Sequence, residues 1–243
     1  MKVPPQTTND RKNNYLLLHG YGESPSVWNN LNLILRENNR LAIHLIKLFD
    51  NSNNHQSFEL LTNAINNQVS SGTTIIANSM GGYLALELLH QKPELFEKLI
   101  LISTHPFCDT LVKTRQRIRE IEFIEKGKAN LLGQLIAHPH EEPVKSNLTT
   151  MWTQWSDRAL TNALKAMTNR QSREETVYKS SIPIHFIIGE NDTSIEIRQL
   201  EAIVKDSANT TLHLIPGQGH WQLHHWQPPF TNVLMQCLAL ETT

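Results

Sequence analysis

Short apolar runs alternate with amphipathic stretches along the chain. The runs are nearly continuous in apolar character and rich in β-branched residues, which is typical of strands covered on both sides. They predict strands at residues 15–19, 41–48, 73–78, 98–103, 182–192 and 210–216. The stretches between them carry apolar residues three and four positions apart, which predicts helices at 27–38, 57–71, 80–90, 196–206 and 230–241.

Strands that alternate with helices predict an α/β fold, in which a mostly parallel sheet has helices on both faces. Between residues 104 and 181 the alternation stops, and the pattern indicates helices at 115–127, 130–138 and 157–171. Since ligands of open parallel sheets bind at the carboxyl ends of the strands, we expect this block to be a cap inserted over that edge. The chain would then be one domain, with a core of 14–103 and 182–243 and a cap of about 104–181.

Polar signals follow several of the predicted strands. The glycine-rich segment HGYGES occupies residues 19–24, Ser79 follows the strand TTIIAN, and Asp192 and His220 follow the last two strands. Because the ends of parallel strands meet at one edge of the sheet, these groups can lie together. Ser79 taken alone is also compatible with a plain helix N-cap, since serine is favoured there.

With these residues in this order, the chain resembles the α/β-hydrolase superfamily. The order Ser79, Asp192, His220 matches that family, and the glycine-rich turn after the first strand matches its oxyanion loop. The likeness extends from about Tyr15 to Leu240. It is strongest to small single-domain enzymes with a helical cap, a group that includes MenH-like proteins, carboxylesterases and enol-lactonases.

The resemblance implies nucleophilic acyl transfer. Ser79 would attack a carbonyl, His220 would accept its proton, and Asp192 would fix the tautomer of the imidazole. The backbone N–H groups of Tyr21 and Met80 would stabilise the oxyanion. We therefore expect a serine hydrolase that cleaves a small-molecule ester, thioester or lactone through a Ser79 acyl-enzyme. A lyase of the MenH or hydroxynitrile type, using the triad as a base, and a small-molecule receptor on the same fold are the alternatives.

The chain departs from the family pattern in two places. The elbow sequence is usually G-x-S-x-G, and Ala77 occupies the position of its first glycine. We expect one methyl group to be tolerated there. Only about fourteen residues precede the first strand, so the antiparallel hairpin common at the start of the fold is expected to be reduced or absent.

Other polar and aromatic residues have competing interpretations. Asp109, after the fourth strand, is the alternative acid for the triad. Trp152 and Trp155 are three positions apart, which places them on one helix face, more often as core of the cap than as substrate contacts. The candidates for contact with substrate are His19, Gly20, His105, Trp152, Trp155 and Trp221.

Net charge and the spacing of cysteines and histidines indicate which partners and cofactors to expect. A net charge of −1 provides no reason to expect nucleic acid or an anionic membrane as a partner. Cys108 and Cys237 lack metal-type spacing, and the histidines of HPH at 138–140 lack zincin spacing, so no metal and no cofactor are expected. Because the N-terminal stretch has no apolar leader, a cytoplasmic location is the default expectation. The oligomeric state stays open.

Overall fold

The computed structural model describes residues 14–38, 40–44, 57–66 and 69–240. In this part of the chain six strands form one sheet in the order β2-β1-β3-β4-β5-β6, and every neighbouring pair is parallel. The strands are β1 (Asn14–Leu18), β2 (Leu41–His44), β3 (Thr73–Asn78), β4 (Phe96–Ile102), β5 (Ile184–Gly189) and β6 (Thr210–Ile215). The expected parallel α/β architecture is therefore confirmed.

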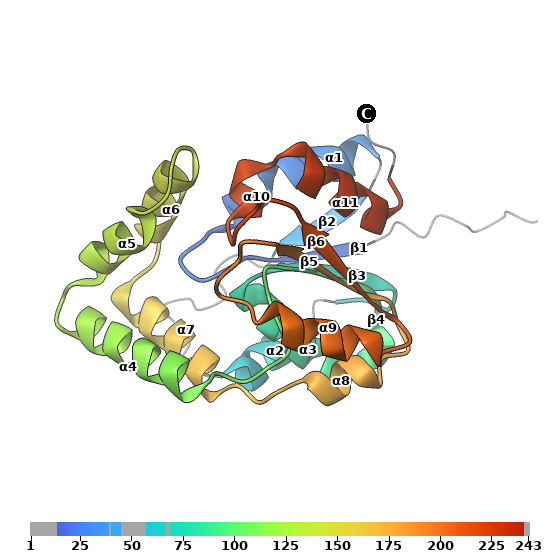
Figure 1. Cartoon of the computed structure of the whole chain (residues 1–243), viewed down its shortest axis with the longest axis horizontal. Helices are drawn as coiled ribbons and strands as arrows, with labels where there is room; N and C mark the ends of the chain where they lie inside the picture. Colours follow the sequence, from blue (N-terminus) through green and yellow to red (C-terminus); the bar gives the residue numbers. More distant parts are fainter. Residues whose placement is uncertain (1–13, 39, 45–56, 67–68, 241–243) are drawn as a thin grey trace, which may run out of the picture.

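Helices cover both faces of the sheet (Figure 1). One face carries the 3₁₀ helix η1 (Pro25–Trp28), α1 (Asn29–Glu37), α10 (Gln222–His225) and α11 (Pro228–Leu238). The other carries α2 (Phe58–Asn66), α3 (Met80–Gln91), α8 (Glu174–Tyr178) and α9 (Ile197–Lys205), with η2 (Pro93–Leu95) between α3 and β4. Two apolar clusters, one on each side of the sheet, form the core.

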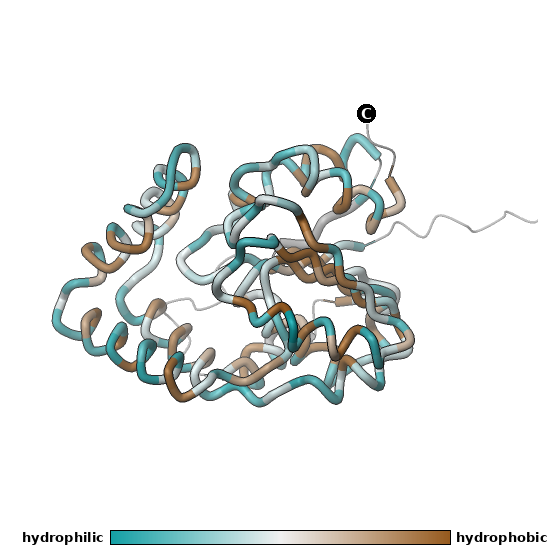
Figure 2. The backbone as a smooth tube through the Cα atoms, viewed as in Figure 1, coloured by the Kyte–Doolittle hydropathy of each residue, from teal (hydrophilic) through white to brown (hydrophobic). Residues whose placement is uncertain are grey.

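Strand periodicity explains how the two clusters arise. Successive side chains of a strand point to opposite faces, so Leu16 and Leu18 join the cluster beneath α2 and α3, whereas Tyr15 and Leu17 join the cluster beneath α1 and α11. Every residue of β3 is buried. Figure 2 shows hydrophobic residues concentrated in the strands at the centre of the molecule. Burial on both faces accounts for the uninterrupted apolar runs in the sequence.

Four helices inserted between β4 and β5 stand at one end of the sheet (Figure 1). They are α4 (Leu111–Glu125), α5 (Ala129–Ala137), α6 (Val144–Trp152) and α7 (Asp157–Asn169). Side chains cap the N-termini of α4 and α7. Thr110 accepts a hydrogen bond from the N–H of Lys113, and Ser156 accepts one from the N–H of Ala159. We call α4 to α7 the helical insertion.

The helical insertion is shorter than the 104–181 block expected from the sequence. Within that block, α8 packs against α3 and α9 on the face of the sheet. The apolar pattern missed this division because α8 is only five residues long, too short for a helical period to emerge. Three of the expectations fall on residues outside the described part of the chain. The reduced hairpin concerns residues 1–13, the end of the second strand residues 45–48, and part of the second helix residues 67–68. Among the described helices, none has the length and apolar character needed to cross a membrane.

Candidate active site

The turn between β3 and α3 holds Ser79 in an unusual backbone conformation. Its φ is 49° and its ψ is −113°, and its N–H donates to the carbonyl of Ile102 on β4 at 2.9 Å. A non-glycine residue at positive φ is strained, and the surrounding sheet has to hold it there. The Ser79 side chain makes no capping hydrogen bond. The plain N-cap interpretation of Ser79 is therefore wrong, and its hydroxyl is free for another partner.

Close packing of strand and helix produces this turn. A Cβ atom added at Gly81 would lie 2.3 Å from the carbonyl oxygen of Leu18, so only glycine fits between α3 and β1. Ala77 pairs with Leu18 on β1 and Leu101 on β4 and is fully buried. Its methyl group is accommodated within the sheet, and the elbow forms without a glycine at that position.

Ser79, His220 and Asp192 meet at the carboxyl edge of the sheet. The Ser79 Oγ lies 3.0 Å from His220 Nε2, and His220 Nδ1 lies 2.8 Å from Asp192 Oδ2. The other carboxylate oxygen of Asp192 accepts a hydrogen bond from the N–H of Ser194 at 2.9 Å. The Asp192 side chain is fully buried, whereas that of His220 is 19% exposed. The three side chains form a hydrogen-bonded chain from the buried carboxylate of Asp192 to the hydroxyl of Ser79.

The loop that carries His220 is attached to the middle of the sheet. The Ser103 hydroxyl donates to the backbone carbonyl of His220 at 2.9 Å. The side-chain amide of Gln222 donates to Ser103 Oγ at 3.2 Å and to the carbonyl of Ile187 at 3.1 Å. Neither Ser103 nor Gln222 belongs to a local motif, so the sequence alone does not indicate their role. Both restrict where the imidazole can lie.

A buried carboxylate organises the glycine-rich loop after β1. The N–H of Gly20 donates to Glu23 Oε2 at 2.6 Å, and the Asn78 side chain donates to both carboxylate oxygens at 2.9 and 3.0 Å. His224 Nε2 lies 2.7 Å from Glu23 Oε1. Burial by itself would raise the pKa of the Glu23 carboxyl, but these hydrogen bonds and the charge of His224 hold the pKa below its ordinary value. Glu23 is thus an ionised residue inside the protein, and no local motif in the sequence indicates its role.

The two candidate oxyanion donors lie on the same edge. Met80 is the first residue of α3, so helix geometry leaves its N–H without an intrahelical acceptor. Tyr21 lies in the loop after β1, where its ring packs edge-on against Trp152 at 5.4 Å. Gly22 next to it has a φ of +72°, and a Cβ there would lie 2.5 Å from the Trp152 ring. Loop and helical insertion are therefore in tight contact.

A cavity of about 450 Å³ opens beside Ser79 and His220. Its walls come from the loop after β1, the loops after β4 and β5, and helices α4 to α7. Four of the substrate-contact candidates line it, namely Gly20, His105, Trp152 and Trp221. Tyr21 lines it as well.

His19 and Trp155 lie outside the lining of this cavity. His19 is buried, and its ring packs edge-on against Trp155 at 5.8 Å. The indole N–H of Trp155 donates to the carbonyl of Glu23 at 2.6 Å. The expectation that Trp152 and Trp155 share a helix face is wrong, because α6 ends at Trp152 and Trp155 follows in a turn. Spacing alone could not locate that helix end.

His105 forms part of an aromatic wall of the cavity. Its ring stacks on Phe107 at 5.4 Å, and its Nδ1 accepts a hydrogen bond from the N–H of Phe107 at 3.2 Å. Its Nε2 lies 3.4 Å from the Tyr83 hydroxyl. Burial, followed by the charge of Arg170, lowers the pKa of His105 to about 3. The imidazole is therefore neutral near pH 7.

Asp109, the alternative acid, has other partners. Its Oδ2 accepts from Arg117 Nε at 2.7 Å, and its Oδ1 accepts from Arg170 Nη1 at 2.6 Å. Although burial opposes ionisation, the two guanidinium groups hold the pKa of Asp109 below its ordinary value. The Arg170 guanidinium also lies over the Tyr83 ring, 3.9 Å from its centroid. Both oxygens of Asp109 therefore bind arginines, one on α4 and one directly after α7, and Asp192 is the carboxylate that contacts His220.

Part of the chain is similar in sequence to a known esterase. A stretch of 101 residues, 40% of the chain, is 32% identical to a pimeloyl-[acyl-carrier protein] methyl ester esterase of Wigglesworthia glossinidia brevipalpis. That stretch spans only 38% of the relative.

Solved structures reproduce nearly the whole fold. A structure from work on carboxylesterases of Nitrososphaera gargenis has a TM-score of 0.83 at 17% identity, covering 94% of this chain and 90% of that one. MenH from S. aureus has a TM-score of 0.76 at 15% identity, covering 94% of both chains. At such identities the likeness shows the fold alone. The family model described as the alpha/beta hydrolase fold matches residues 16–225. Since that match covers most of the chain, the chain belongs to the alpha/beta hydrolase fold family.

Proposed function

We propose that the protein is a serine hydrolase that cleaves a small-molecule carboxylic ester, thioester or lactone through an acyl-enzyme on Ser79. The observation that carries the proposal is the hydrogen-bonded chain from Asp192 through His220 to Ser79, which ends at the wall of a cavity. A serine hydroxyl is a weak nucleophile unless a base lies within hydrogen-bonding distance, and binding alone would not need one.

In this mechanism His220 accepts the Ser79 proton as the Oγ attacks the substrate carbonyl. Asp192 accepts a hydrogen bond from Nδ1 of His220, which leaves Nε2 as the base and stabilises the imidazolium. Collapse of the tetrahedral intermediate releases the alcohol or thiol, protonated by His220. A water molecule activated by the same imidazole then releases the acid and restores Ser79.

The negative charge of the intermediate needs donors that are already in place. We assign this role to the N–H groups of Met80 and Tyr21. The helix α3 starts at Met80, so its dipole adds to the stabilisation. The Tyr21 donor sits on the loop organised by Glu23.

The helical insertion is proposed as the cap that shapes the substrate pocket, because α4 to α7 supply much of the cavity wall. The name of the Wigglesworthia relative, a methyl ester esterase, favours an ester over a carbon–carbon bond as the target. A small-molecule acyl compound is the proposed partner, with neither nucleic acid nor membrane involved, and the proposed location is the cytoplasm.

A fluorophosphonate probe and p-nitrophenyl esters of short acids test the proposal together. The wild-type protein should form a covalent adduct and release p-nitrophenol, and Ser79→Ala should lose both activities. Ser71→Ala, which changes an exposed serine elsewhere, is the matched control and should retain both. Labelling of Ser79 without turnover of any ester, thioester or lactone in a broad panel would contradict the hydrolase and favour the lyase or the receptor.

A further inference from the structure

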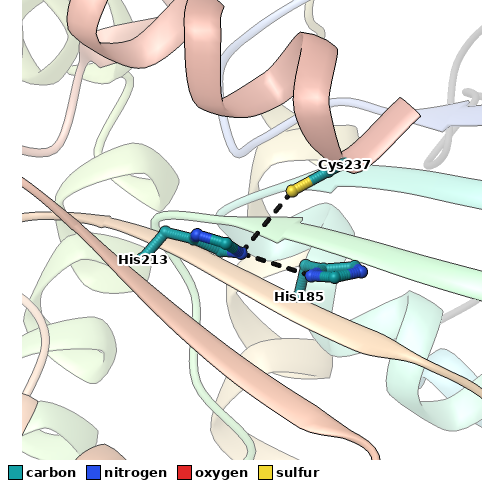
Figure 3. A group of neighbouring side chains, drawn as sticks. All are labelled: His185, His213 and Cys237. Atoms are coloured by element: carbon teal, nitrogen blue, oxygen red, sulfur yellow. Dashed lines mark hydrogen bonds between the residues drawn. The ribbon is translucent and has the colours of Figure 1, made fainter. Parts of the chain in front are cut away.

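A second cluster of reactive side chains lies away from the cavity, between the sheet and α11. His185 comes from β5, His213 from β6 and Cys237 from α11, and Figure 3 shows the three side chains directed toward one another. One ligand atom from each lies within 4.8 Å of the other two. We propose that His185, His213 and Cys237 form a binding site for a borderline transition-metal ion of the Zn²⁺ type.

The spacing of the donor atoms suits a tetrahedral ion. Zn–N bonds of about 2.05 Å and a Zn–S bond of about 2.3 Å place two nitrogens about 3.3 Å apart and a nitrogen and a sulfur about 3.6 Å apart. His185 Nδ1 and His213 Nε2 are 3.2 Å apart, and His213 Nε2 and Cys237 Sγ are 3.6 Å apart. The remaining pair, His185 and Cys237, is at most 4.8 Å apart and has to close by up to about 1.2 Å to reach the same geometry. Rotation of the half-buried His185 ring would supply such a movement.

The position of the cluster in the fold is unusual for polar side chains. His185 and His213 point to the face of the sheet that α11 covers, where the next residues of the same orientation, Ile187 and Ile215, are fully buried. Burying imidazole and thiol groups there is unfavourable compared with apolar side chains. His213 Nε2 joins the three groups through hydrogen bonds to His185 and Cys237 (Figure 3), and a bound metal ion would replace these contacts with stronger ligand bonds.

The protonation states are suited to metal binding in part. Burial, with the neighbouring charges of His213 and Lys98, lowers the pKa of His185 to about 4, and burial also lowers the pKa of His213. Both rings are therefore neutral near pH 7, the form that binds metals. Burial raises the pKa of the Cys237 thiol to about 11, although Lys98 acts in the opposite direction. Metal binding would release the thiol proton of Cys237.

The ligand set selects the kind of ion. Thiolate and imidazole favour Zn²⁺ over Mg²⁺ and Ca²⁺, which require oxygen ligands. Three protein ligands leave one position for water, which can enter because both histidines are partly exposed. The bound ion would link α11 to β5 and β6, so it is expected to stabilise this end of the sheet.

Titration of the full-length, chelator-treated and reduced protein with Co²⁺ tests the site. One equivalent per chain should produce a thiolate-to-cobalt band in the near ultraviolet and the visible bands of tetrahedral Co²⁺, and Zn²⁺ should displace it. Cys237→Ser should abolish the thiolate band. His185→Asn and His213→Asn should each weaken binding at least about tenfold, since one of three protein ligands is lost.

Cys108→Ser is the matched control, because Cys108 is the other cysteine and lines the cavity beside His105. It should leave the spectrum unchanged. Absence of the band in the wild-type protein, its survival in Cys237→Ser, or its loss in Cys108→Ser would each overturn the proposal. Ester turnover and circular dichroism of Cys237→Ser check that the variant is folded. If it is not, His185→Asn decides by the same titration, and wild-type affinity in that variant would refute the site.

Discussion

Glu23 and His224 form a buried pair beneath the loop that follows β1, although 201 positions separate them in the chain. Their side chains are fully buried, with Oε1 and Nε2 2.7 Å apart. The same carboxylate accepts hydrogen bonds from the N–H of Gly20 and the side chain of Asn78. It therefore connects the proposed oxyanion loop, the residue before Ser79 and α10. We infer that Glu23 positions the loop, because its buried carboxylate is held by these partners.

Replacing Glu23 with glutamine should lower kcat about tenfold to a hundredfold while KM changes little. The new amide keeps the shape but turns one acceptor into a donor, which faces the N–H of Gly20 or the ring of His224. The Tyr21 N–H would then be misplaced, and loss of an oxyanion donor costs about 10²–10³ in rate. Steady-state kinetics with a p-nitrophenyl ester measures the effect.

Glu190→Gln is the control for that substitution, since Glu190 is exposed near the same edge of the sheet. It should behave as the wild type. A wild-type kcat for Glu23→Gln, or a rise in KM without a fall in kcat, would exclude a positioning role. Fluorophosphonate labelling of Glu23→Gln should be slowed rather than abolished, because Ser79 and His220 stay in place.

Asp192→Asn should reduce kcat by about 10⁴ and leave the melting temperature nearly unchanged. An asparagine keeps the volume but offers an N–H to His220 Nδ1, which favours the tautomer that cannot accept the Ser79 proton. Kinetics at saturating substrate and thermal unfolding measure the two quantities. A loss below about tenfold would mean that Asp192 is not the acid of the triad.

Asp109→Asn should show the opposite pattern. Its carboxylate neutralises Arg117 and Arg170, whose side chains are 9% and 5% exposed. Removing one partner from a buried ionic cluster leaves uncompensated charge and costs about 3–5 kcal/mol. Urea denaturation should reveal that loss, with any fall in kcat well below that of Asp192→Asn. Equal catalytic damage in the two variants would contradict the assignment.

Gly81→Ala should destabilise the protein and remove activity together. The added methyl group would lie 2.3 Å from the carbonyl oxygen of Leu18, a backbone atom that cannot move aside. Separation of α3 from β1 would displace both Ser79 and the Met80 N–H. Gly219→Ala is the comparison, because a Cβ there meets its nearest atom only at 3.8 Å. A Gly81→Ala protein with normal stability would show that the elbow is looser than its packing implies.

The sequence predicted the sheet well because its signals are local. Strands buried on both faces leave continuous apolar runs, so β3 and β5 were found within a few residues. The proximity of Ser79, Asp192 and His220 could be predicted for a related reason, since each follows such a run and parallel strands end at one edge. The order of the three residues then matched a known family.

Other parts of the site could not be predicted because they depend on contacts between distant segments. Glu23 and His224 carry no local signal, and their pairing appears only when α10 folds against the loop after β1. His185, His213 and Cys237 come from three elements, so no spacing marks them. Trp155 was misplaced since apolar periodicity does not specify where a short helix ends.

His105 should make the stability of the protein depend on pH in the acidic range. Its pKa is lowered to about 3 in the folded state, whereas an unfolded histidine titrates near about 6.5. Between these values the unfolded chain binds a proton that the folded protein does not, so the free energy of unfolding falls as pH falls. One such group contributes up to about 1.4 kcal/mol per pH unit.

In His105→Asn this dependence of the free energy of unfolding on pH should be weaker, as measured by urea denaturation between about pH 4 and pH 6.5. His138→Asn, which changes an exposed histidine, should retain the wild-type slope. If the free energy of unfolding depends on pH equally in the wild type and in His105→Asn, the pKa of His105 in the folded protein is not lowered.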